Sequence, residues 1–273
     1  MHQILALWCH PRSLSTAFGR MMMERGDITV LHERFLYLYY VVQNPDLVIA
    51  QQLEQIEPWM EASFEEIVAG IESAAVQRPV FFKDMAVHVH NAKGRHADEE
   101  FLGRFSNAFL IRDPEIAVLS HLKQNPEMVF EEVGYDAQYA LFEKVSRMTD
   151  AAPPVIDAAD LEEDPAGVIG SYCAAMGIPF MASALRWSTA VPSQLSEGDP
   201  WHADLFATTG FERRVESFSP ELREHPRYAE YCERSIPFYA AMLHHRIQSD
   251  ACSSGGAYAA DGRNRSRPDD NSE

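Results

Sequence analysis

The sequence predicts an α/β fold in which helices flank a central parallel β-sheet. Short apolar runs alternate with longer segments in which apolar residues recur at helical spacing, and this succession repeats along the chain. A repeating order of strand, helix and strand is typical of a parallel sheet covered by helices on both faces. The 273 residues are enough to bury a full core.

The elements follow from these runs in order. Strands are expected at Ile4–Cys9, Thr29–His32, Val80–Lys83, Ala108–Ile111 and Val155–Asp157. Helices are expected near Leu14–Arg25, Met60–Val76, Glu115–Lys123, Asp136–Arg147 and Pro165–Met176, with a later one from about Pro220 to Ile247. Two prolines directly before the last strand are consistent with a loop that enters the sheet.

These elements predict a single domain over residues 1–248. A stretch at about 185–210 is rich in Ser, Thr, Pro and Trp and has no clear period, so it is expected to be an ordered, lid-like excursion. Residues 249–273 are small, polar and glycine-rich, which predicts a disordered C-terminal tail.

Composition narrows the class of partner. The formal net charge is −18, from 41 acidic and 23 basic residues, which disfavours nucleic acid or an anionic membrane as a partner. No window approaches the ~18 to 20 apolar residues of a membrane-spanning helix, and the first residues lack a signal-peptide pattern. Four scattered cysteines without a C-x-x-C pair indicate reduced thiols and no metal site. We therefore expect a cytoplasmic protein.

The first strand ends in a turn that suits an anion. In "HPRSLSTAF", Arg12 and the hydroxyls of Ser13, Ser15 and Thr16 stand where a strand enters a helix, whose first N–H groups and positive dipole end face the turn. The turn lacks the glycines and lysine of a Walker A loop, which argues against ATP or GTP hydrolysis. An open alternative is that Ser13 only caps the helix while Arg12 is solvated.

A second polar stretch follows the fourth predicted strand. In "RDPEIAVLS", Asp113 and Pro114 suit the cap and first turn of a helix, and Ser120 lies eight residues after Arg112. Ser120 is about two turns into that helix, so its pairing with Arg112 is explained by one bulky anion between them. An ordinary capped helix with a surface arginine explains Asp113 and Pro114 but not this pairing.

Together these stretches resemble the sulfotransferases that use 3′-phosphoadenosine 5′-phosphosulfate (PAPS). "PRSLSTA" is similar to the family's turn for the 5′-phosphosulfate, with Leu14 where a glycine is common, and "RDPEIAVLS" matches its 3′-phosphate element with the spacing intact. A third stretch, "PVIDAADLEEDPAGVIGSYCAAMGIPF", resembles a later family run, although Ile156 or Asp157 replaces the usual aromatic residue. The resemblance covers roughly residues 3–180. It implies a P-loop NTPase-like sulfotransferase fold, PAPS as cosubstrate and no required metal.

The resemblance also implies roles for individual residues. Arg12, Ser13, Ser15 and Thr16 would bind the phosphosulfate, and Arg112 and Ser120 the 3′-phosphate. Glu33, at the end of the second strand, would be the general base, and Lys83, at the end of the third, would assist the leaving oxygen together with Arg12, while Asp84 could orient Lys83. Alternatives remain open: Glu33 could pair with Arg34 or a neighbouring helix, Lys83 could be a lysine at the sheet margin, and His88 is a second candidate base.

The acceptor itself is not specified by the sequence. The acidic balance favours a small neutral or cationic molecule with a hydroxyl or amine, and a homodimer is possible. The expected pocket lining is aromatic, from Phe35, Tyr37, Tyr39, Tyr40 and the stretch from Trp187 to Trp201. Two rival functions are a kinase-like phosphotransferase with a degenerate loop and a non-catalytic nucleotide-binding protein.

Overall fold

The computed structural model describes residues 1–48, 61–90, 97–192, 195, 201, 203–212 and 217–249. The predicted C-terminal tail lies outside the described residues from residue 250 onward, as does part of the predicted excursion at 185–210. Within the described part of the chain, no helix is both long and apolar enough to cross a membrane.

Five parallel strands form the central sheet. They are β1 (Ile4–Cys9), β2 (Thr29–His32), β3 (Val80–Met85), β4 (Ser106–Ile111) and β5 (Val155–Asp157), in the order β2-β3-β1-β4-β5. The predicted fold class is confirmed, and three of the strands have the predicted ends. β3 is two residues longer than predicted because Asp84 and Met85 still pair with Trp8 and Cys9 of β1.

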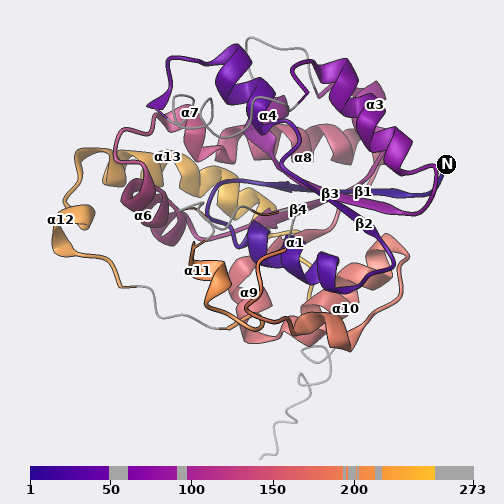
Figure 1. Cartoon of the computed structure of the whole chain (residues 1–273). Coiled ribbons are helices and arrows are strands. Elements are labelled where there is room, and N and C mark those ends of the chain that lie inside the picture. Colours follow the sequence, from indigo (N-terminus) through magenta and orange to yellow (C-terminus); the bar gives the residue numbers. More distant parts are fainter. Residues whose placement is uncertain are drawn as a thin grey trace, which may run out of the picture.

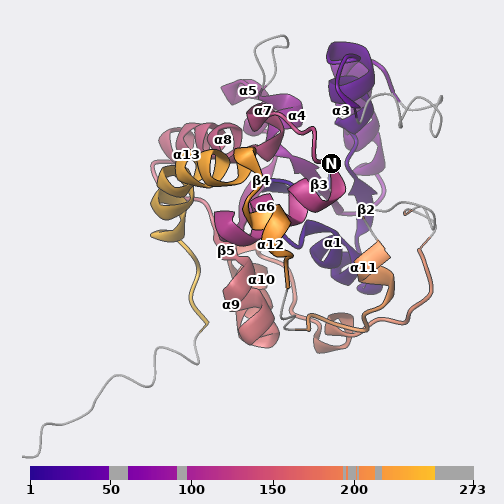
Figure 2. The ribbon, with the colours of Figure 1, turned by 90° about the vertical axis from the view of Figure 1, so that its left-hand side faces the viewer.

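Helices cover both faces of the sheet (Figure 1). One face carries α1 (Ser15–Glu24), α9 (Ala158–Glu163) and α10 (Pro165–Met176), and the other carries α3 (Phe64–Ala74), α4 (Ala86–Val89) and α8 (Tyr135–Thr149). Figure 2 shows α13 (Pro226–Leu243) beside α8, and α13 also packs on α6 (Pro114–Gln124) through Tyr231 and Cys232. The remaining short elements are η1 (Leu38–Gln43, a π-helix), α5 (Glu99–Leu102), α7 (Phe130–Val133), η2 (Ala182–Leu185, a 3₁₀-helix), α11 (Ala203–Phe206) and α12 (Pro220–Arg223).

The predicted helix over 220–247 is in fact two helices. The first, α12, ends at Arg223, and α13 begins at Pro226 after His225, whose side chain accepts a hydrogen bond from the Arg227 N–H. Proline at the first position of a helix has no N–H to lose, so Pro226 favours a new start at this point. The helix predicted from Met60 begins at Phe64, because the Ser63 hydroxyl caps it through the Glu66 N–H.

The topology fixes where a ligand can bind. The strand β1 leads into α1 on one face of the sheet, whereas β3 leads into α4 on the opposite face (Figure 1). A crevice forms outside the carboxyl ends of parallel strands where connections leave in opposite directions. All strands are parallel, so the residues that follow β1, β2, β3 and β4 meet at this same edge.

Candidate active site

Lys83 links the end of β2 to the first turn of α1. Its ammonium group is fully buried, donates to the Ser15 hydroxyl at 3.2 Å and forms an ion pair with the Glu33 carboxylate. Register produces this pairing, since His32 lies opposite Lys83 and the Glu33 N–H donates to the Lys83 carbonyl at 3.0 Å. The candidate base and the candidate cation are therefore in direct contact.

The backbone of Glu33 has an unusual conformation. Its φ of 42° lies in the left-handed region, which is costly for a residue with a side chain and is common at functional sites. Arg34 pairs with Glu61, so the expectation that it could pair with Glu33 is wrong, and the Glu33 carboxylate pairs with Lys83. The Glu33 carboxylate also lies 3.6 Å from Nε2 of His32.

The Asp84 side chain is hydrogen-bonded to the loop that follows β2. Its carboxylate accepts the Phe35 and Met85 N–H groups, both at 2.9 Å, and lies 2.6 Å from Nδ1 of His88. Asp84 therefore binds the turn and His88, whereas the sequence analysis expected it to orient Lys83. The His88 ring is buried against Tyr39 and Tyr40, with ring centroids 5.1 and 5.5 Å away.

The second group of predicted residues gathers around Arg12. The Arg12 Nε donates to the Ser120 hydroxyl at 2.9 Å, and its NH1 donates to the Trp201 carbonyl at 2.8 Å. Arg112 is mostly buried and donates from NH1 to the Arg12 carbonyl at 3.1 Å, while its NH2 lies 3.9 Å from the Glu162 carboxylate. The structure thus brings Arg12 together with Arg112 and Ser120, which lie 100 and 108 residues away from it in the sequence.

The turn between β1 and α1 leaves the helix start without a side-chain cap. The Ser13 hydroxyl donates back to the His10 carbonyl at 2.7 Å, so the alternative in which Ser13 caps α1 is wrong. Arg12 and Leu14 both have left-handed backbones, with φ of 65° and 68°. At position 14 a glycine would adopt this conformation without strain. The first N–H groups of α1, including that of half-buried Thr16, thereby keep the potential to bind an anion.

A family model described as a sulfotransferase domain matches residues 2–247. The chain belongs to the sulfotransferase domain family. The sulfotransferase domain of the Synechococcus PCC 7002 olefin synthase is 14% identical with a TM-score of 0.50, and the match covers 86% of this chain and 95% of that one. This likeness shows the fold.

Two Arabidopsis thaliana proteins are also similar in sequence. Branched-chain-amino-acid aminotransferase-like protein 2 is 27% identical over 77% of this chain and 36% of its own length, and protein 1 is 24% identical over 89% and 42%. The sulfotransferase chain thus spans about two fifths of the length of these relatives.

Sequence analysis missed the residue that ties β1 to β4. Nε2 of His10 accepts the Arg112 N–H at 3.1 Å, and Nδ1 lies 2.9 Å from the Pro11 carbonyl. Burial lowers the pKa of His10 to about 3, so the ring is neutral with one donor and one acceptor nitrogen, as these two contacts require. A histidine at a strand end gave no signal of this role.

Acidification is expected to destabilise the protein partly through His10. The unfolded histidine takes up a proton near pH 6.5 but the folded one only near pH 3, so the free energy of unfolding falls as the pH is lowered through this window. The contribution is about 1.4 kcal/mol per pH unit. Urea unfolding from pH 7 to 4 should show a shallower pH dependence for His10→Gln than for the wild type. A wild-type slope in His10→Gln would contradict this contribution.

Two residues of α8 also support the candidate site by binding backbone carbonyls at the ends of β1 and β4. The Tyr135 hydroxyl donates to the Arg112 carbonyl at 2.6 Å, and its ring stacks on His10 with centroids 4.0 Å apart. The Gln138 side chain donates to the carbonyls of Trp8 and Leu110, both at 2.9 Å. They hold the ends of β1 and β4 at a fixed separation.

Tyr135→Phe should therefore lower the free energy of unfolding by about 1–2 kcal/mol, because a buried carbonyl loses its donor. Urea denaturation measures the loss. On the exposed side of the same helix, Tyr139→Phe removes only a 3.2 Å bond to Glu143 and should change stability by less than about 0.5 kcal/mol. Equal losses in the two variants would contradict the role given to Tyr135.

The aromatic residues expected to line an acceptor pocket have different positions. Phe35 is fully buried in the core, and Trp187 is buried against Phe211. The guanidinium carbon of Arg12 lies over the Trp201 ring, 5.8 Å from the ring centroid. Tyr39 and Tyr40, which contact His88, lie close to the β3 end and stay candidates for the acceptor side.

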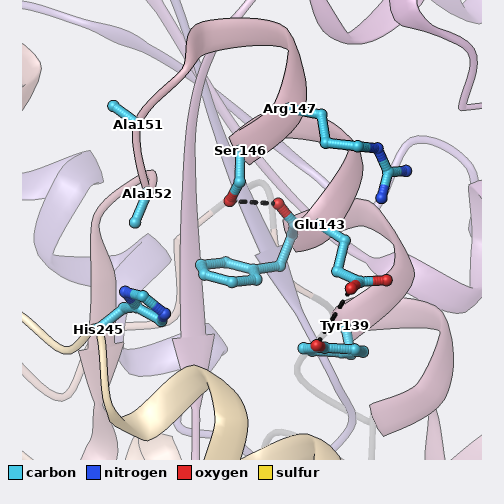
Figure 3. Close-up of a pocket in the computed structure, with 8 residues that line it drawn as sticks. Tyr139, Glu143, Ser146, Arg147, Ala151, Ala152 and His245 are labelled. Carbon is cyan, nitrogen blue, oxygen red and sulfur yellow. Dashed lines mark hydrogen bonds between the residues drawn. The ribbon is translucent and has the colours of Figure 1, made fainter.

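A groove of about 340 Å³ lies elsewhere on the protein (Figure 3). It runs along the exposed side of α8, from Tyr139 to Arg147, and is closed by His245 and by Ala151 and Ala152 before β5. Residues that precede β5 lie at the amino edge of the sheet, opposite the edge with the predicted site residues. The groove holds none of them.

Proposed function

We propose that this sulfotransferase transfers a sulfuryl group from PAPS to a hydroxyl or amine of a small-molecule acceptor. The observation that supports this best is the meeting of four strand ends. One group of residues joins Ser15, Lys83 and Glu33, and a second joins Arg12, Ser120 and Arg112. The turn from His10 to Ser15 connects them. Two linked groups suit a cosubstrate with an anion at each end.

The two groups would divide the cosubstrate between them. Arg112 and Ser120 bind the 3′-phosphate, since a guanidinium and a hydroxyl both donate to its oxygens. The first turn of α1, with Ser13, Ser15 and Thr16, receives the 5′-phosphosulfate through uncapped N–H groups and the helix dipole. Arg12 is part of the turn between the two groups: its Nε donates to Ser120, and its backbone carbonyl accepts from Arg112.

Lys83 and Glu33 supply the chemistry in this proposal. The acceptor oxygen or nitrogen attacks sulfur while the bond from sulfur to the nucleotide's bridging oxygen breaks, and the acceptor's proton passes to Glu33. Charge that builds on the leaving oxygen is stabilised by the Lys83 ammonium. In the free protein Lys83 neutralises Glu33, so binding of an anionic cosubstrate draws the ammonium toward the leaving oxygen and makes the carboxylate available.

The acceptor side favours a neutral or cationic molecule. Burial and then Glu132, Tyr39 and Glu33 raise the pKa of Tyr40, so the negative charges of both glutamates act on this ring. Glu132 is buried, and one of its carboxylate oxygens has no hydrogen-bond partner. An anionic acceptor would meet repulsion from these groups, whereas an amine or hydroxyl could donate to them.

The decisive measurement compares two product-like nucleotides by calorimetry. 3′,5′-ADP should bind about 10-fold to 100-fold more tightly than 5′-ADP, because only the former reaches Arg112 and Ser120. Equal affinities would contradict the proposed cosubstrate. A preference for ATP with Mg²⁺ would instead favour the kinase-like alternative.

A further inference from the structure

His121 follows Ser120 on α6 and holds a buried nitrogen that has no hydrogen-bond partner. The residue is only 2% exposed, and its Nε2 atom is without a partner. Buried polar atoms in native proteins are nearly always hydrogen-bonded, so an orphaned atom beside a predicted anion site indicates a missing ligand.

The surroundings of His121 are positively charged or aromatic. Burial and then the positive charge of Arg12 lower the pKa of His121 to about 3, so its ring is neutral and carries one N–H. The Trp201 ring lies against it in a T-shaped contact with centroids 5.4 Å apart, and the Trp201 carbonyl accepts from Arg12. His121 therefore contacts the same tryptophan as Arg12, the arginine that donates to Ser120.

We propose that His121 is a further binding residue for the 3′-phosphate and donates to it from Nε2. This inference rests on the proposed function, which already gives that phosphate to Arg112 and Ser120. A phosphate monoester has three terminal oxygens, enough to accept from the imidazole, the guanidinium and the hydroxyl together. Its negative charge also suits a pocket whose charged neighbours are arginines. His121 would then help this protein to distinguish nucleotides with a 3′-phosphate from those without one.

The test is the affinity of the full-length protein for 3′,5′-ADP and 5′-ADP, measured by calorimetry. His121→Phe keeps a ring against Trp201 but removes the donor, and should weaken 3′,5′-ADP about tenfold while 5′-ADP changes by less than about threefold. His121→Gln restores a donor near the Nε2 position and should recover most of the loss. His244→Phe, at an exposed histidine, is the matched control and should change neither affinity.

Each other outcome has a definite meaning. If His121→Phe weakens both nucleotides equally, or neither, His121 does not bind the 3′-phosphate and the inference is overturned. If the wild type itself does not bind 3′,5′-ADP more tightly than 5′-ADP, it is the proposed function that is contradicted. Melting curves without ligand check folding, and if the Phe variant does not fold, His121→Asn removes the Nε2 position with a smaller side chain.

Discussion

Replacing Glu33 by Gln is expected to lower kcat by about 10²-fold to 10⁴-fold, the usual contribution of a general base. The amide is nearly isosteric with the carboxylate and can still accept from Lys83, but it cannot take the acceptor's proton. Affinity for 3′,5′-ADP should change little, since the nucleotide's phosphates are assigned to Arg112, Ser120 and the first turn of α1. Transfer of labelled sulfate from PAPS to an acceptor, followed under single-turnover conditions, measures the loss.

The chain offers a matched control for this experiment. Glu61 is also a carboxylate in an ion pair, with Arg34, but it lies outside the proposed site. Glu61→Gln should leave kcat within about twofold of the wild type. If Glu33→Gln is as active as Glu61→Gln, Glu33 is not the base, and His88 with its partner Asp84 becomes the residue to test.

The fold could be predicted because its determinants are local. Strands β1, β2 and β5 end where the apolar runs end, and parallel pairing then brings their carboxyl ends to one edge whatever the loops do. That single geometric consequence explains why Arg12, Glu33, Lys83 and Arg112 meet. The break between α12 and α13 was missed, because the aromatic residues keep helical spacing across it and the proline signal at Pro226 is weaker than that pattern.

The choice of partners within the site could not be predicted. Whether Lys83 contacts Glu33 or Asp84 depends on side-chain directions at neighbouring strand ends, and alternate residues of one strand point to opposite faces. Trp201 reaches Arg12 from almost 190 residues away along the chain, and no local pattern encodes such a contact. His10 and His121 were missed for a similar reason, since their roles come from burial against arginines of other elements.

Lys83→Met is expected to abolish detectable transfer and to lower the free energy of unfolding by about 3 kcal/mol. The ammonium group is fully buried between Ser15 and Glu33, so its removal leaves the Glu33 carboxylate, with a side chain only 11% exposed, without its cationic partner. Urea denaturation measures the stability, and the transfer assay measures the activity.

The double variant Glu33→Gln with Lys83→Met separates the two effects. It removes both buried charges, so the free energy of unfolding should recover to within about 1 kcal/mol of the wild type, because breaking a buried pair costs more than replacing it. Activity should stay lost, because both the base and the cation at the leaving oxygen are gone. Stability losses that simply add in the double variant would show that the two side chains do not interact in solution. Recovered activity would show that neither acts in the transfer step.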